Sequence, residues 1–454
     1  MKDPLKIFGF WWLPKEGEIK NPGTLHYSQK DGITLELYSK DEIPLEEEFQ
    51  PEQIILGFSE NGEEITLYKC KVFQAQSNIF GGLSKRQYLV ELLFIGAHFV
   101  NYDQIKFKVL SGQITDLDFW LNSSNIRIDR NFLDQNKPNT MITYSAPESR
   151  VVDISSLVKI EIQHSTRITH QRMRCSIEET KEINIVCKGE AIHFLELNRF
   201  FKIFLELVQM AAQRKIYIPK LNGTLALENR KDILQKKEVA IYYQPIEELQ
   251  EQRQLTPADF LFMYDDTSDK MIENWFNIYD NHENEISLYQ TLFFKDRLFI
   301  ETRYLNIVTA LESLHSQKFD NAYIDKKEFK MRRNEIVESF PKYEEWLNNI
   351  FESANYKRLK SKINELLLNK SDLFSKLIED ISKFSDSVVD TRNEIVHHKK
   401  KKSSFEKEKL IYVIFILRFL FEAYMMEMIG FSETQVSKSV KKCEERYLSW
   451  GEAM

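Results

Sequence analysis

The chain has 454 residues, of which 43% are hydrophobic and 29% charged, a globular composition that excludes disordered, fibrous and collagen-like chains. At roughly 100 to 200 residues per domain, this length predicts two or three domains. The net charge is −7, but residues 286–454 carry 29 basic and 26 acidic side chains, so the C-terminal part is the more favourable place for a polyanion.

The cysteines are far apart in sequence and form no C-x-x-C pair: Cys70, Cys175, Cys187 and Cys443. Their spacing predicts neither a disulfide framework nor a zinc site, and the expected setting is a reducing cytoplasm. The N-terminus lacks the apolar stretch of a secretory signal. The most apolar segment, residues 410–431, is interrupted by charged residues, which predicts a buried bundle helix and no membrane span.

Residues 5–122 read as short β-branched and aromatic runs between turn residues, typical of an antiparallel β domain. Two hairpins are predicted around Asp31-Gly32 and Asn61-Gly62, because glycine accepts the positive φ that such turns need. The expected strands are 24–28, 33–38, 54–58, 64–73, 87–94 and 106–110. Residues 130–149 are polar and contain two prolines, which predicts a connection.

A second group mixes strands with one helix. Strands are expected near 158–163, 167–177, 182–187 and 238–243, and an amphipathic helix at 193–212. The pattern leaves open whether this group is a separate domain or the other half of the first.

Beyond about residue 280 the apolar residues recur three and four apart, as in helices. Helices are predicted at 292–317, 343–351, 358–368, 372–398 and 405–428. The predicted fold class is therefore α+β and multidomain, with a β-rich N-terminal half followed by an all-α helical bundle. The expected domains are 1–145, 146–285 and 286–454.

The segment from Thr391 to His398, Thr-Arg-Asn-Glu-Ile-Val-His-His, is the most informative. On a helix, Arg392 falls within the apolar arc, where it needs a carboxylate, an anionic ligand or a partner chain. Asn393 and His397 are four residues apart and lie side by side. A cation, an amide and an imidazole together suit a phosphodiester.

A plainer interpretation stays open, since R-x-x-x-x-H arises by chance in many helices and histidines and lysines favour helix C-termini. Part of this segment occurs a second time in the chain, which allows the two copies to be compared. The pentapeptide from Arg333 to Val337 repeats that from Arg392 to Val396 but is followed by Glu338, so we interpret this first copy as structural.

Arg-Asn-x-x-x-His near the end of the penultimate long helix resembles the HEPN superfamily over residues 286–440. Six short N-terminal motifs, in order, resemble the N-terminal domain of the ApeA-like family of bacterial anti-phage proteins. They are Trp11-Trp12-Leu13-Pro14, Pro22-Gly23-Thr24-Leu25, Ile55-Leu56-Gly57, Ile65-Thr66-Leu67, Gly96-Ala97-His98-Phe99 and Leu117 to Trp120. The resemblance spans nearly the whole chain.

The resemblance implies a cytoplasmic, metal-independent endoribonuclease without a cofactor that cleaves RNA, with tRNA as one candidate, to arrest the infected cell. It implies a homodimer or higher homo-oligomer and an N-terminal half that recognises a phage-derived trigger. His397 would be the general acid or base, Arg392 would stabilise charge on the phosphate, and Asn393 would orient these groups.

Two further assignments come from the residues themselves. Glu312 is a candidate partner for Arg392, and an ordinary exposed helix glutamate is an equal alternative. The run Lys399, Lys400, Lys401 and Lys402 is expected to guide the RNA backbone, or is a solvated charge run. The rival function is a catalytically silent HEPN scaffold that binds RNA or a nucleotide, with an N-terminal protein-interaction module.

Overall fold

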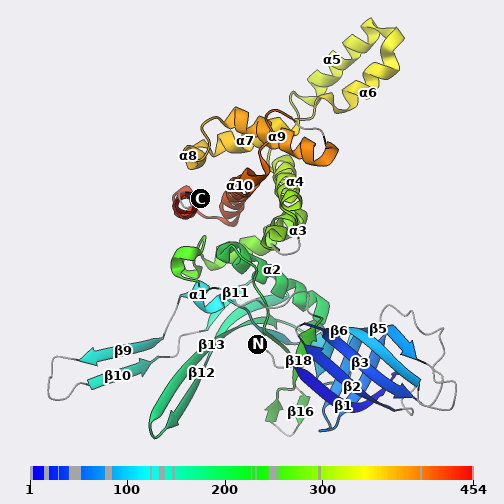
Figure 1. Ribbon diagram of the computed structural model, residues 1–454, viewed down its shortest axis with the longest axis vertical. Coiled ribbons are helices and arrows are strands. Elements are labelled where there is room, and N and C mark those ends of the chain that lie inside the picture. Colours follow the sequence, from blue (N-terminus) through cyan, green and yellow to red (C-terminus); the bar gives the residue numbers. More distant parts are fainter. Residues whose placement is uncertain are drawn as a thin grey trace. The chain divides into compact units, whose positions relative to one another are not determined.

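A computed structural model describes most of the chain. The described residues are 4–14, 20–28, 30–39, 53–76, 84–122, 125–131, 139–145, 149–225, 228–230, 233–244, 253, 255–294, 298–398 and 401–451. They fall into two compact units, residues 1–208 with 216–269, and residues 209–215 with 270–454. The first unit is β-rich and the second is helical (Figure 1), which confirms the predicted fold class.

The β-rich unit is built on one antiparallel sheet of 12 strands, in the order β11-β12-β13-β8-β15-β18-β6-β3-β2-β1-β4-β5. An additional pairing of β5 with β6 closes the first six strands into a barrel (Figure 1). Those strands are β1 Leu5–Trp12, β2 Asn21–Ser28, β3 Gly32–Ser39, β4 Ile54–Ser59, β5 Glu64–Gln76 and β6 Ser84–Ile95. Both predicted hairpins, β2–β3 and β4–β5, form.

The barrel core contains Trp11, which is fully buried among inward-facing aliphatic side chains. Gly57 on the neighbouring strand β4 leaves room for it, because a Cβ there would lie 2.3 Å from the Trp11 ring. The turn glycines Gly32 and Gly62 have φ of 80° and 79°, the left-handed conformation that was predicted for them.

We expect Trp11→Ala to destabilise the β-rich unit by about 3 to 5 kcal/mol, because it leaves a cavity in a closed core. Urea unfolding of the purified protein measures this change. The matched control is Phe10→Ala, which removes a side chain that is 51% exposed on the same strand. Equal losses for the two variants would contradict the buried role of Trp11.

The second strand group extends the same sheet. Its strands are β8 Val109–Gln113, β11 Arg150–Asp153, β12 Val158–Gln171, β13 Arg174–Cys187, β15 Lys220–Thr224 and β18 Glu238–Tyr243. Helix α2, Phe194–Ala212, forms as predicted and places Phe201 directly over Gly112 of β8. The predicted domain boundary at residue 145 therefore falls inside one continuous sheet.

Two predictions in this group were wrong. The segment 167–177 is not one strand, because β12 and β13 turn at Arg172 and Met173; no glycine or proline marks this turn. The polar segment 130–149 is not merely a connection. Within it, β10 Asn139–Tyr144 pairs with β9 Ile126–Asn131, since Thr140, Ile142 and Thr143 supply β-branched residues.

The main segment of the helical unit begins at residue 270, earlier than the predicted boundary at 286, because α3 spans Asp269–Gln290. Its other helices are α4 Ile300–Lys318, α5 Lys326–Ser339, α6 Glu344–Ala354, α7 Leu359–Asn369, α8 Ser371–Phe374, α9 Ile381–His397, α10 Leu410–Ile429 and α11 Glu433–Gly451. Helix α10 is buried along most of its length, as predicted. Within the described residues, no helix is both long and apolar enough to cross a membrane.

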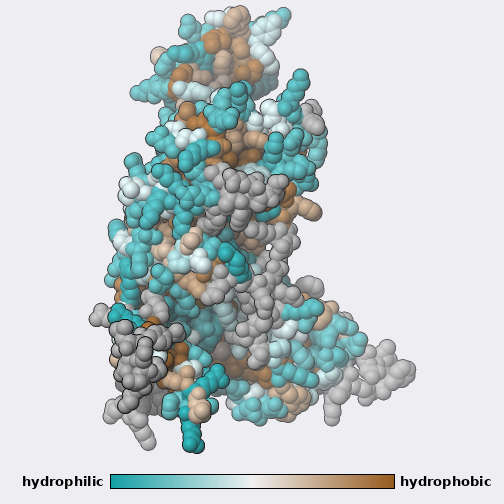
Figure 2. Space-filling model, turned by 60° about the vertical axis from the view of Figure 1, so that its left-hand side comes forward, coloured by the Kyte–Doolittle hydropathy of each residue, from teal (hydrophilic) through white to brown (hydrophobic). Residues whose placement is uncertain are grey.

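Helices α5 and α6 form a hairpin held by a Phe329–Phe351 ring contact and by Arg333, whose Nη2 donates to Asn348 Oδ1 at 2.8 Å. Arg333 begins the first copy of the repeated pentapeptide, so this copy joins two helices. Apolar residues remain at the hairpin surface (Figure 2), among them Trp346, which is 62% exposed.

Candidate active site at the end of helix α9

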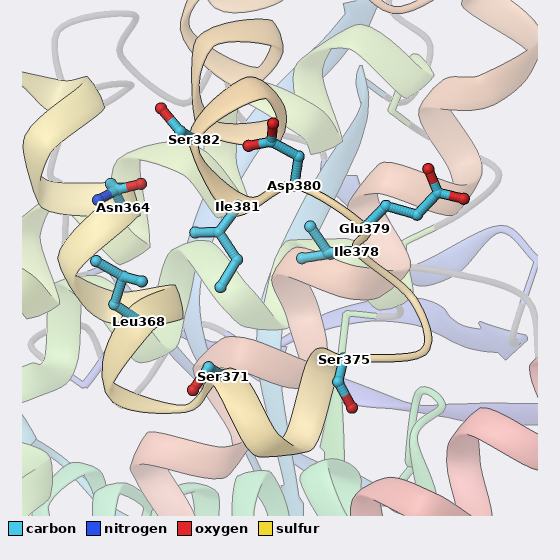
Figure 3. A pocket seen from close by; sticks show the side chains of 9 residues that line it. All are labelled: Asn364, Leu368, Ser371, Ser375, Ile378, Glu379, Asp380, Ile381 and Ser382. Atoms are coloured by element: carbon cyan, nitrogen blue, oxygen red, sulfur yellow. The ribbon is translucent and has the colours of Figure 1, made fainter.

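Helix α9 carries the Arg-Asn-x-x-x-His segment and begins later than predicted. The Asp380 side chain accepts a hydrogen bond from Lys383 N at 3.0 Å and caps the first turn, so the predicted helix 372–398 is divided into α8 and α9. A pocket of about 560 Å³ lies at this end, lined by Leu368, Ile378 and Ile381 among others (Figure 3). The 17 residues of α9 place the pocket about 25 Å from His397.

The middle of α9 is held by buried hydrogen bonds. Val388 is fully buried, and its carbonyl oxygen accepts a hydrogen bond of 2.7 Å from the Tyr304 hydroxyl on α4. Burial raises the pKa of Tyr304, so this hydroxyl stays protonated as a donor. One turn later, Thr391 Oγ1 accepts a hydrogen bond from Phe405 N at 2.8 Å, which fixes the chain that follows the helix.

Arg392 is half-buried beside this anchored turn. Its Nη1 donates to Asn393 Oδ1 at 3.2 Å. No carboxylate in the described part of the chain forms an ion pair with it. Of the three partners predicted for this guanidinium, an anionic ligand and a partner chain therefore remain.

His397 is the last residue of α9 and is exposed. His398 ends the helix with φ of 54°, and its backbone N–H donates to Glu394 O at 2.8 Å. Residues five apart are about 140° apart around a helix, so Arg392 and His397 leave α9 in different directions. Asn393 lies about 40° from His397, on the same side of the helix.

The pairing of Glu312 with Arg392 was not found. Glu312 Oε1 lies 3.6 Å from Lys362 Nζ of α7, and no described contact joins it to Arg392. The reason is its position along α4: Tyr304 contacts α9, and Glu312 is eight residues further on, about 12 Å along the helix axis.

The lysine run is described only in part. Lys399 and Lys400 lie outside the described residues, while Lys401 and Lys402 are exposed. The backbone N–H of Lys401 donates to Glu394 Oε2 at 3.4 Å, which keeps Lys401 beside α9. Guidance of RNA by these lysines stays a prediction.

Tyr304 and Thr391 are positioning residues that sequence reasoning did not select. Thr391 precedes Arg392 on the buried face, and a polar residue there was a usable signal. Tyr304 offered no such signal, because a tyrosine in an amphipathic helix is usually an ordinary core residue.

We expect Tyr304→Phe to destabilise the helical unit by roughly 1 to 3 kcal/mol, since the Val388 carbonyl loses its buried side-chain donor. Thermal unfolding measures this change. Tyr323→Phe is the control, because that hydroxyl is exposed. A loss no larger than that of the control would contradict the anchoring role.

The side chains of Arg392, Asn393 and His397 at the end of α9 are suited to bind an anion and to transfer a proton. A guanidinium without a carboxylate partner attracts phosphate, and an exposed imidazole can serve as a general acid or base. Among the described residues, no group of three or more His, Cys, Asp and Glu side chains is arranged to hold a metal ion.

Comparison with protein families also divides the chain into an N-terminal and a C-terminal part. The family model described as ApeA N-terminal domain 1 matches residues 6–275, and the model described as Apea-like HEPN matches residues 305–435. The second match includes Arg392, Asn393 and His397. No significant match was found among curated proteins or among solved structures. The chain therefore belongs to the ApeA-like family, with an ApeA N-terminal domain followed by an Apea-like HEPN domain.

Proposed function

We propose that this chain is a metal-independent endoribonuclease of anti-phage defence that acts in the cytoplasm and arrests the infected cell by cleaving RNA. The arrangement of side chains at the end of α9 supports this proposal most strongly. There, a half-buried Arg392 bound to Asn393 has no described carboxylate partner, and His397 is exposed on the last turn. These residues lie within the HEPN match.

The chemistry follows from these groups. A base removes the proton of the ribose 2′-hydroxyl, and the resulting oxygen attacks the adjacent phosphorus in line with the leaving group. The bond from phosphorus to O5′ breaks, and an acid protonates that oxygen. The products are a 2′,3′-cyclic phosphate and a 5′-hydroxyl. His397 performs the proton transfers, Arg392 stabilises the charge on the phosphate and Asn393 orients both.

The reaction benefits from both a base and an acid, yet one Arg-Asn-x-x-x-His motif contains one imidazole, that of His397. Two copies related by a two-fold axis would bring two His397 and two Arg392 side chains to one phosphate. The divergence of Arg392 and His397 around α9 supports this arrangement, because one helix alone does not direct both at one atom. Val396, which lies within the motif and is 42% exposed, offers apolar surface to a second copy.

Sequencing of RNA ends in phage-infected cells tests the proposal. Cells with the wild-type chain should accumulate new ends at defined positions, in tRNA or in another class of RNA, and cells with His397→Ala should not. Identical ends in both strains would contradict nuclease activity at this motif.

The same experiment separates the enzyme from a catalytically silent scaffold. A scaffold would bind RNA or a nucleotide and arrest growth without new RNA ends. In the proposed enzyme, the ApeA N-terminal domain recognises a phage-derived trigger and the HEPN domain cleaves.

A further inference from the structure

The β12–β13 hairpin extends beyond the sheet of the β-rich unit (Figure 1). Near its base, β12 pairs with β11 up to Ile162, and β13 pairs with β8 from Ile183. Farther out, the described strands β12 and β13 pair only with each other. We define residues 164–181 as the arm.

The arm is ordered along its length by bonds between its two strands. At its base, His164 Nδ1 and Glu179 Oε1 are 2.9 Å apart, and both side chains are about nine-tenths buried. Farther out, the hydroxyls of Thr169 and Ser176 are 2.7 Å apart. A ligand that binds the arm therefore meets a preformed ribbon and does not have to order it.

The outer part of the arm is exposed and cationic. Residues 167–175 are all exposed, and they include Arg167, Arg172, Arg174 and His170. No acidic residue occurs between 165 and 177. Residues 1–285 carry 33 basic and 43 acidic side chains. The cationic tip therefore belongs to a part of the chain whose net charge is negative.

The acids nearest to the tip form no ion pair with its arginines within the described residues. Glu179 is bonded to His164 and Asn125 at the base of the arm. Glu178 lies opposite Arg167 in the strand register, without an ion pair between them. No ion pair to any of the three arginines occurs within the described residues. Their guanidinium groups are therefore available to an anionic partner.

We propose that the arm binds the phosphate backbone of the RNA that the chain cleaves, an inference that rests on the proposed function. Guanidinium groups bind phosphate oxygens with two parallel hydrogen bonds. The arm has no Phe, Tyr or Trp on which a base could stack, so its contacts go to the backbone and carry no sequence preference. RNA held by the arm stays on the chain that carries His397.

The test measures binding with the full-length His397→Ala protein, in which the RNA stays uncleaved. The probe is a mixed-sequence single-stranded RNA oligonucleotide, titrated over a range of salt concentrations. In this background, Arg167, Arg172 and Arg174 are replaced together by glutamine. We expect the slope of log affinity against log salt to fall in magnitude by about 2, and affinity near 0.1 M salt to fall at least about tenfold.

A charge-matched control replaces Lys202, Lys237 and Lys270 by glutamine. These lysines are exposed and lie outside the arm, each in an ion pair with a glutamate. The control should keep most of its affinity. Unchanged RNA binding by the arm variant, or an equal loss in the control, would overturn the proposal; a partner protein would then be the better occupant of the arm.

The same triple replacement in the wild-type background separates this inference from the proposed function. We expect the RNA concentration for half-maximal cleavage to rise while the rate at saturating RNA is kept. If the wild-type chain does not cleave RNA but the arm variant still loses binding, the nuclease assignment fails and RNA binding by the arm stands.

Discussion

Replacing His397 by alanine is expected to lower RNA cleavage by at least about 10² to 10⁴ and to abolish growth arrest, because the imidazole performs the proton transfers. Replacing Arg392 by alanine should have a comparable effect, since it removes the charge that binds the phosphate. Both side chains are outside the fully buried core, so thermal unfolding should change little. Initial rates of cleavage measure the effect.

Two controls are built into the chain. His398 adjoins His397 but ends the helix with a positive φ, so His398→Asn keeps a residue suited to that conformation and should be nearly as active as wild type. Arg333→Gln alters the same pentapeptide in α5, where the arginine donates a hydrogen bond to Asn348. As the control for Arg392, this variant should keep its cleavage activity. Equal activity of His397→Ala, or a larger loss at His398, would overturn the assignment.

A dimer of one wild-type chain and one His397→Ala chain is expected to cleave RNA at a rate at least about 10²-fold lower than that of the wild-type dimer. The reason is that the proposed site needs one histidine as base and the other as acid. Independent sites would keep half of the activity. The mixed dimer is obtained by co-expressing the two chains with different affinity tags and purifying on both.

The matching control is a mixed dimer with one His398→Asn chain, which should keep its activity. Light scattering establishes the mass of each active species. A fully active monomer, or a mixed dimer with half of the wild-type rate, would contradict a site assembled from two copies.

Much of the fold could be predicted from local sequence signals. Gly32 and Gly62 mark turns that only a residue tolerant of positive φ fills readily, and both hairpins formed around them. The turn at Arg172 and Met173 carries no such residue, so one strand was predicted across the turn where two strands form. The capping role of Asp380 was visible in principle, as an acid immediately before a periodic run.

The part of the candidate site that lies on a single helix could be predicted from the sequence. Arg392, Asn393 and His397 follow from spacing on α9 alone. A partner from another helix depends on how far along each helix the two pack together, which periodicity does not contain. For that reason, Glu312 was named as a candidate partner of Arg392, although Tyr304, two turns away on α4, makes the hydrogen bond to α9.

The proposed cleavage of RNA by His397 and Arg392 needs no metal ion. The most direct test is the chemistry of the RNA ends produced by the purified full-length chain in excess EDTA. We predict undiminished cleavage that leaves 2′,3′-cyclic phosphate and 5′-hydroxyl ends, because the arginine and the histidine supply the charge and the protons. Products with 5′-phosphate ends that disappear when EDTA is added would contradict this mechanism.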